Sequence, residues 1–312
     1  MTSATVHLVV TCSNRKTTAV PAELRFATVP GENVGDRFSA WTSRLELSAC
    51  SSVAAIDLYS GEHWYVARSL PAIAQDAGFA VKLWVCSAGY GLVPADALLK
   101  PYSATLARRH TDSVAQTSDD ARAWWHMQSA WTGPVPGLPR SLAELAGRDP
   151  DSVIIAALSA TYLASCGNDV IAAAGKLVAH ENLSLVSAGT SSRGAFADVL
   201  CPVDGDLQRP LGGTLMSLNV RAVGHILASL KAEVPTRPAA RRVIAKLSEA
   251  TAPAIRPKRE PASDEEIRGL IVDRLRSAPG SCTSMLRQFR SEGRACEQSR
   301  FARLYAEAKG GI

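Results

Sequence analysis

The chain has 312 residues, of which 46% are hydrophobic and 20% are charged. These values predict a globular protein with a sizeable core, divided into one large and one smaller domain. The longest apolar region, residues 153–178, is interrupted by Asn168, Asp169 and Lys176, which excludes a membrane-spanning segment. The N-terminus lacks the basic start of a signal peptide. We therefore expect a cytoplasmic protein with no membrane partner.

Cysteine usage and charge add two expectations. The cysteines are seven in number, they are scattered, and no CxxC pair occurs, so neither a disulfide framework, a metal site nor a cofactor is expected. Residues 233–312 hold 16 Lys and Arg against 10 Asp and Glu, whereas residues 1–232 hold 18 against 19. A basic C-terminal quarter indicates a polyanion partner. The alternative is a solvated helical face.

The first 230 residues alternate near-continuous apolar runs with amphipathic stretches. The apolar runs are typical of parallel strands buried on both faces, and the stretches between them predict helices. The predicted strands are 5–12, 81–88, 152–159 and 183–189. The predicted helices are 37–50, 62–78, 118–131, 161–179 and 211–230. Together they predict a layered α/β/α domain over residues 1–231 with a mainly parallel central sheet.

The remainder of the chain changes in composition. Residues 232–263 are rich in Pro, Ala and Arg, which predicts a basic linker, helical in part at 239–250. Residues 264–312 predict three short helices, with Gly293 in the turn between the last two. This pattern favours a helix-turn-helix unit that binds DNA. The alternative is a small helical cap on the main domain. The residues expected to reach phosphates or base edges are Arg287, Arg290, Gln298, Arg300 and Arg303.

Ligands bind beyond the carboxyl ends of strands in sheets of this kind, so the loops after the predicted strands are candidate sites. Ser13, Asn14 and Lys16 follow the first strand directly and suit a phosphate or a water, although an Asx turn explains them equally. Asp57 precedes an aromatic residue, a glycine and a helix. It is either a base held against a sugar or a water, or a helix cap.

Two later loops have similar features. In "CSAGYGLVPADALLKPYSATL", residues 86–106, Gly89 and Gly91 permit close approach of a ligand, and Tyr90 and Tyr102 can stack on a base or sugar. The alternative is that both rings pack the loop onto the sheet. In "SAGTSSRG", residues 187–194, three hydroxyl groups precede an arginine, which suits a phosphate.

Part of the chain resembles the YaaA-like family, named for the bacterial peroxide-stress protein. The family carries a Tyr-x-Gly, a Ser-x-x-Tyr-Gly-Leu-x-x-Pro stretch and a Pro-Tyr pair. The matching residues are Tyr59, Gly61, Ser87, Tyr90, Gly91, Leu92, Pro94, Pro101 and Tyr102. "VVTCSNRK" is similar to the first-strand motif of related proteins, so the resemblance covers about residues 5–107.

The resemblance implies a DNA-binding protein related in fold to the uracil-DNA-glycosylase superfamily. It places Asn14 where that superfamily orients the attacking water, and we expect Asp57 to be the carboxylate that stabilises the sugar. The expected base pocket comprises Ser13, Tyr59, Ser87, Tyr90, Gly91 and Tyr102. The expected phosphate contacts are Lys16, Ser191, Ser192 and Arg193. Residues 187–194 lack the superfamily's histidine, which favours a base other than uracil or a loss of catalysis.

Three functions follow. The first is a DNA glycosylase that flips a modified or damaged base out of double-stranded DNA and leaves an abasic site. The resemblance extends this to phage-defence enzymes that excise glucosylated hydroxymethylcytosine. The second is a non-catalytic DNA-binding protein of a stress response. The third is a nucleotide or nucleoside transferase, which leaves the basic C-terminal segment without a role.

Overall fold

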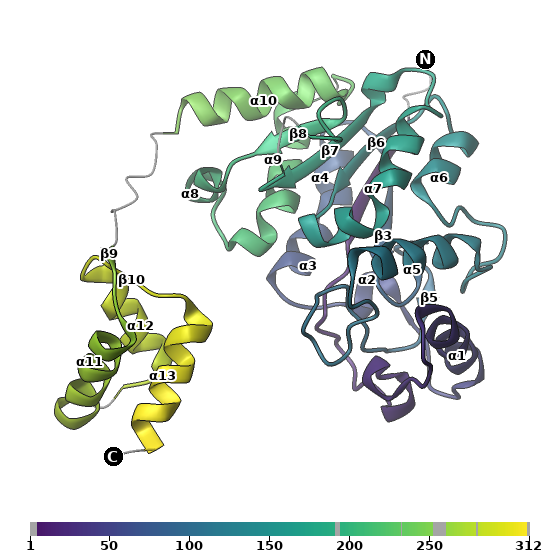
Figure 1. The fold of residues 1–312 in the computed structure, drawn as a ribbon. Coiled ribbons are helices and arrows are strands. Elements are labelled where there is room, and N and C mark those ends of the chain that lie inside the picture. Colours follow the sequence, from purple (N-terminus) through teal and green to yellow (C-terminus); the bar gives the residue numbers. More distant parts are fainter. Residues whose placement is uncertain (1–4, 191–193, 232, 252–259, 279, 311–312) are drawn as a thin grey trace. The chain divides into compact units, whose positions relative to one another are not determined.

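The computed structural model describes residues 5–190, 194–231, 233–251, 260–278 and 280–310. The chain forms two compact units, Met1–Ala252 and Pro253–Ile312. Figure 1 shows the first unit as a sheet with helices on both faces and the second as a small helical bundle. Each unit has its own hydrophobic core. None of the helices in these described ranges is both long and apolar enough to span a membrane.

A six-stranded sheet forms the centre of the first unit, with the strands in the order β4-β3-β1-β6-β7-β8. Every neighbouring pair is parallel except β3 with β4. The strands are β1 (Thr5–Thr11), β3 (Ala80–Ser87), β4 (Gly91–Pro94), β6 (Val153–Ala157), β7 (Leu183–Ala188) and β8 (Leu200–Val203). The predicted mixed α/β fold with a mainly parallel sheet is therefore confirmed. The strands β4 and β8 do not stand out in the sequence, because each has only four residues and lies at an edge of the sheet.

Helices cover both faces of this sheet (Figure 1). One layer contains α4 (Leu70–Asp76), α9 (Leu218–Leu230) and α10 (Arg237–Glu249). The other contains α5 (Ser118–Ala130), α6 (Leu142–Arg148) and α7 (Ala160–Ala174), with α1 (Val34–Leu47) packed against α5. The strands are therefore buried on both sides, which explains their near-continuous apolar sequences.

Shorter elements complete the first unit. They are α2 (Ala55–Leu58), α3 (Glu62–Ala67) and α8 (Gln208–Leu211), together with the antiparallel pair β2 (Val53–Ala54) and β5 (Leu98–Leu99). The single helix predicted at 62–78 is two helices, α3 and α4. Pro71 stands in the first turn of α4, where its missing N–H would have had no partner inside the helix.

The first unit extends beyond residue 231, where the sequence analysis places its end. The helix α10 packs against β7, β8 and α9, and its buried residues join the core of that unit. Arg237 donates to the carbonyl oxygen of Leu183, and Arg241 donates to that of Leu200. The Ala-rich and Arg-rich sequence that indicates a linker is thus a packed helix, and the arginines hold it to the start of two strands.

The C-terminal unit contains α11 (Asp264–Ser277), α12 (Cys282–Ser291) and α13 (Gln298–Gly310). A short parallel pair, β9 (Glu260–Pro261) and β10 (Arg294–Ala295), accompanies these helices. A capping box between Ser263 and Glu266 starts α11. The three helices enclose a core that includes Ile267, Ile271, Phe289 and Phe301. The positions of the two units relative to one another are not determined.

Candidate functional site

The candidate site lies at the carboxyl ends of β1, β3 and β6. After β1 the chain continues to its neighbour β3 on one side. The strand β6 lies on the other side of β1, and from there the chain continues outward to β7 and β8. The connections therefore diverge between β1 and β6, which makes this the topological switch point of the sheet. Open α/β sheets bind ligands in the crevice at such a point.

The loop after β1 is held against the segment that follows α2. Lys16 pairs with Tyr59 in an isolated antiparallel bridge, and the amide of Ser60 donates to the carbonyl oxygen of Arg15. The hydroxyl of Ser13 donates to the carbonyl oxygen of Ser60 over 2.6 Å. These contacts bring two sequence motifs together that are more than 40 residues apart. Among the predicted pocket residues, Ser13 therefore fixes the loop through its own hydroxyl group.

A network of buried hydroxyl groups lies beneath this loop. The Tyr102 hydroxyl lies 2.6 Å from the Ser87 hydroxyl and 3.1 Å from the Tyr59 hydroxyl. Ser87 also accepts a hydrogen bond of 3.0 Å from the Tyr90 amide. Burial raises the pKa of the Tyr59 and Tyr102 phenols, so both stay protonated at neutral pH. The structure thus brings these predicted pocket residues together, with their side chains buried and bonded to one another.

Two residues that the sequence analysis did not select extend the network to the switch point. The Cys12 sulfur lies 3.1 Å from the hydroxyl of Tyr162, which stands in the first turn of α7 after β6. Tyr102 donates to the same sulfur over 3.6 Å. The position of Tyr162 just past a predicted strand was a signal that could have identified it. We call this set the strand-end cluster: Cys12, Lys16, Tyr59, Ser87, Tyr102 and Tyr162.

Lys16 is the cation of the strand-end cluster. Its ammonium donates to the carbonyl oxygens of Ser13 and Asn14, over 3.0 and 3.1 Å. It also lies over the rings of Tyr102 and Tyr59, 4.4 and 5.2 Å from their centroids. Burial lowers the pKa of Lys16, an effect that the negative charge of Asp112 opposes. Among the described residues, the hydrogen-bond acceptors of this ammonium are these two carbonyl oxygens, so they engage two of its three protons.

Asn14 is exposed and faces His110, with its Nδ2 atom 3.3 Å from the His110 Nε2. The His110 Nδ1 accepts a hydrogen bond from the Asp112 amide, so in the neutral ring the proton is on Nε2. Two donors cannot bond, and a half turn of the amide places Oδ1 towards His110 instead. Asn14 then offers N–H groups to a ligand. The predicted water-orienting role would need its oxygen free.

Asp57 is separate from the strand-end cluster. Its carboxylate pairs with Arg68 over 3.4 Å, and both side chains are at least half exposed. Within the described part of the chain it makes no hydrogen bond to a residue of the cluster. Its backbone carbonyl oxygen accepts the Thr17 hydroxyl, so the residue helps to hold the first loop. The structure therefore gives no geometric support for its predicted catalytic role.

The two glycines around Tyr90 serve the packing of the protein itself. Gly89 and Tyr90 lie in the turn between β3 and β4. A side chain on Gly89 would come within 2.5 Å of the Tyr102 ring, and one on Gly91, whose φ is +75°, would meet Gln128 and Arg140. The expected approach of a ligand is thus occupied by protein atoms at both positions. Tyr90 and Trp131 also line a cavity of about 230 Å³.

The predicted phosphate loop lies partly outside the described residues, since Ser191, Ser192 and Arg193 are not among them. The residues just before it are well connected. The Ser187 hydroxyl bonds to that of Thr190 over 2.9 Å. Asn219 of α9 accepts from the Ala188 amide and donates to the carbonyl oxygen of Leu158, which joins the ends of β6 and β7.

An exposed apolar pair, Leu215 and Met216, stands beside α3 at this edge of the sheet. Their exposed fractions are 61% and 83%. Glu62 at the start of α3 holds this loop, because it accepts hydrogen bonds from the Thr214 amide and the Ser217 hydroxyl. These bonds lower the pKa of Glu62 to about 2, so its carboxylate stays ionised at neutral pH.

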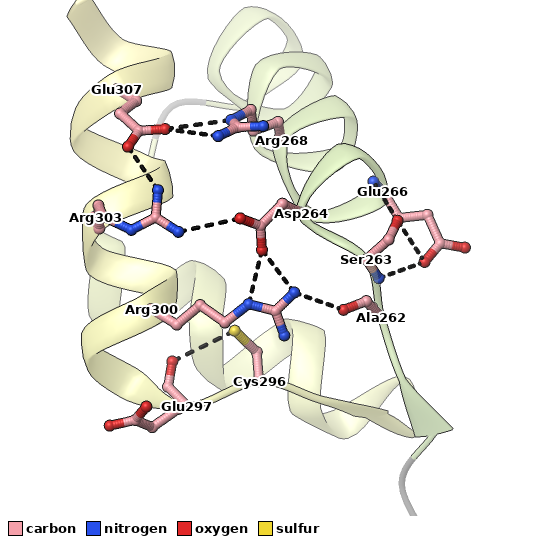
Figure 2. Close-up of polar contacts among 10 residues, drawn as sticks. All are labelled: Ala262, Ser263, Asp264, Glu266, Arg268, Cys296, Glu297, Arg300, Arg303 and Glu307. Carbon is pink, nitrogen blue, oxygen red and sulfur yellow. Dashed lines mark hydrogen bonds and ion pairs between the residues drawn. The ribbon is translucent and has the colours of Figure 1, made fainter.

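In the C-terminal unit, most of the predicted DNA-contacting arginines are bound to other protein groups. Figure 2 shows that Arg300 and Arg303 both reach the carboxylate of Asp264, and that Arg303 also pairs with Glu307. Arg290 donates to the carbonyl oxygen of Cys296. Arg287 and Gln298 are exposed.

Comparisons with protein-family models, with curated proteins and with solved structures find no match. Within the described ranges, no group of three or more His, Cys, Asp or Glu side chains is arranged to hold a metal ion.

Proposed function

We propose that the protein is a DNA glycosylase that removes a modified or damaged base and leaves an abasic site. The observation that carries this proposal is the Lys16 ammonium at the switch point, which is held by two carbonyl oxygens and forms no ion pair with a described carboxylate. In hydrolysis of the glycosidic bond, the base takes the electron pair of the broken bond, water supplies a hydroxyl group to C1′, and the remaining proton passes to the base. Negative charge therefore develops on the base.

Preorganised donors stabilise such a charge most strongly where water is excluded. Lys16 is a positive donor, and the rings of Tyr59 and Tyr102, whose phenols are neutral, lie beside it. Asn14 binds an acceptor atom of the base or a phosphate through its N–H groups. Asp57 has no part in this mechanism, since its carboxylate is paired with Arg68 at the surface.

The apolar pair Leu215 and Met216 supports a duplex substrate. A base that leaves the stack leaves a gap, and proteins fill such gaps with apolar side chains. The hydrogen bonds that Glu62 accepts hold this pair at the edge of the sheet where the strand-end cluster lies. The cost of exposing Met216 to water in the free protein is then offset when DNA is bound.

A second function, a non-catalytic DNA-binding protein, is favoured by a different observation. The hydroxyl groups of Tyr59, Ser87 and Tyr102 bond to one another and are almost fully buried. In this function the strand-end cluster holds the loops in place and no bond is broken. The two functions make opposite predictions for one assay.

The test incubates the full chain with duplex DNA that carries unmodified bases, hydroxymethylcytosine or its glucosylated form, and then measures alkali-labile sites. We expect abasic sites on at least one modified DNA. The variant Lys16→Met keeps the length of the side chain and should lower the rate by about a hundredfold or more. The control Lys82→Met, which changes an exposed lysine of β3, should leave the rate unchanged.

Formation of abasic sites at the wild-type rate by Lys16→Met would contradict the role of the ammonium. Absence of abasic sites on every substrate, with DNA binding retained, would overturn the glycosylase and favour the non-catalytic function.

A further inference from the structure

The three helices of the C-terminal unit differ in the side chains that they expose. The helix α12 is strongly amphipathic: Met285, Leu286 and Phe289 are buried in the core of this unit. Cys282 packs against the same core, the remaining side chains are polar or basic, and the helix contains no Asp or Glu. We call the exposed set the α12 face: Thr283, Ser284, Arg287, Gln288 and Ser291.

The helix α13, which the sequence analysis favours for DNA contact, is different. The Arg300 guanidinium donates to Asp264 and to the carbonyl oxygen of Ala262 (Figure 2). Arg303 lies between two carboxylates, those of Asp264 and Glu307. Arginine side chains paired in this way attach α13 to α11, and their charge is compensated before any phosphate approaches.

The overall charge of this unit does not select a binding surface. Residues 260–310 hold nine Lys and Arg against eight Asp and Glu, so most of the basic excess lies outside them. The distribution of charge on single helices is therefore more informative than the sum. Of the described residues, none forms an ion pair or a hydrogen bond with the side chain of Arg287. Arg294, seven residues further on, is exposed beside the Phe289 ring.

We propose that the α12 face is the surface through which the C-terminal unit binds double-stranded DNA. The hydroxyl groups of Thr283 and Ser284 and the side chains of Arg287 and Gln288 are of the types that donate hydrogen bonds to phosphate oxygens, whereas the Ser291 hydroxyl donates to the carbonyl oxygen of Gln288. No carboxylate on the helix repels the backbone. The choice of DNA as the partner rests on the proposed function, whereas the choice of α12 over α13 rests on the ion pairs.

The first experiment measures the affinity of the full chain for an unmodified 20-base-pair duplex at several salt concentrations. Arg287→Ala should weaken binding several-fold and reduce the slope of log K against log salt by about 1, as expected for one lost phosphate contact. Arg303→Ala should change neither quantity to that extent. The opposite result, with Arg303→Ala lowering the slope and Arg287→Ala leaving it unchanged, would overturn the proposal in favour of α13.

The second experiment uses a matched pair of added charges. Gln288→Glu places a carboxylate on the α12 face, and Ala302→Glu places one on the exposed surface of α13. We expect Gln288→Glu to weaken binding far more than Ala302→Glu, with equal melting temperatures. Equal losses would show that only the total charge matters and would overturn the proposal. Both experiments measure binding alone, so their outcome does not depend on whether the protein excises a base.

Discussion

Cationic side chains play different parts in the two units. In the α/β unit, Lys16 donates its protons to backbone carbonyl oxygens and lies over two aromatic rings. In the C-terminal unit, Arg300 and Arg303 donate to carboxylates. A carbonyl oxygen orients a cation but carries no net charge. A carboxylate orients the cation and also neutralises its charge. The charge of Lys16 is therefore not neutralised by a bonded carboxylate, whereas the two arginines use their charge to join helices.

The same distinction applies to the basic residues near the end of the α/β unit. Arg237 and Arg241 of α10 bond to carbonyl oxygens at the amino ends of β7 and β8, opposite to the edge that carries the strand-end cluster. Further basic residues at 256, 258 and 259 lie outside the described part of the chain. A sum of charges over a segment thus overstates the cationic surface that remains unpaired.

The largest expected effect tests whether the two units are independent. Phe289→Ala removes a fully buried ring from the core of the C-terminal unit and should lower its free energy of unfolding by about 3–5 kcal/mol. Calorimetry of the full chain should show this loss in one transition only. The exposed variant Thr283→Ala is the control. A shift of both transitions together would show that the units fold as one.

A pH profile tests the charge of Lys16. Because burial lowers the pKa of this ammonium, activity that needs its positive charge should fall as pH rises through that lowered value, before an ordinary lysine would lose its proton. The measurement is the rate of abasic-site formation from neutral to alkaline pH, with DNA binding followed in parallel. Lys16→Arg should move the alkaline decline to higher pH. An unchanged profile would contradict the assignment.

The hydroxyl group of Tyr102 should by itself contribute to the free energy of unfolding of the α/β unit. Tyr102→Phe removes the hydroxyl that bonds to Ser87 and Tyr59, and it leaves buried groups with a missing partner. We expect a loss of about 1–3 kcal/mol in the unfolding of the α/β unit, and no change in the other unit. Chemical denaturation with fluorescence measures it. An unchanged free energy of unfolding in Tyr102→Phe would contradict this contribution and would indicate that water replaces the lost hydroxyl group.

The smallest effect on stability is expected from the loss of a helix cap, which can be compared between the two units. Thr117 caps α5 in the first unit and Ser263 caps α11 in the second, each in a capping box. Replacing either residue with Ala should lower the stability of its own unit by about 1 kcal/mol. Thermal unfolding of both variants tests this. A shift in the other unit's transition would indicate that the caps act across the linker.

Much of the fold follows from the sequence, because a strand buried on both faces needs an unbroken apolar run. This holds for β1, β3, β6 and β7. The predicted loop at residues 86–106 contains a strand, β4, whose four residues are too few to give a period. The helix predicted at 62–78 is divided before Pro71, because proline is tolerated only in the first turn of a helix and therefore marks the start of α4.

The candidate site was predictable only in part. The motifs around Ser13, Tyr59, Ser87 and Tyr102 meet because each follows or faces the carboxyl edge of the same sheet. Tyr162 was not selected, because its position just past a predicted strand was its one signal and a tyrosine in an apolar helix also fits a core residue. Asp57 was selected because it precedes a helix, but its side chain turns to Arg68 at the surface.

The sequence by itself determined the alternation of strands and helices, the strand-end loops and a separate helical unit, because these depend on local periodicity and short-range turns. Only the tertiary structure decided which charges are paired and which hydroxyl groups meet. Ion pairs such as Arg300 with Asp264, and contacts such as Cys12 with Tyr162, join residues 36 and 150 positions apart. No pattern along the chain encodes such separations, because they arise when whole elements pack together.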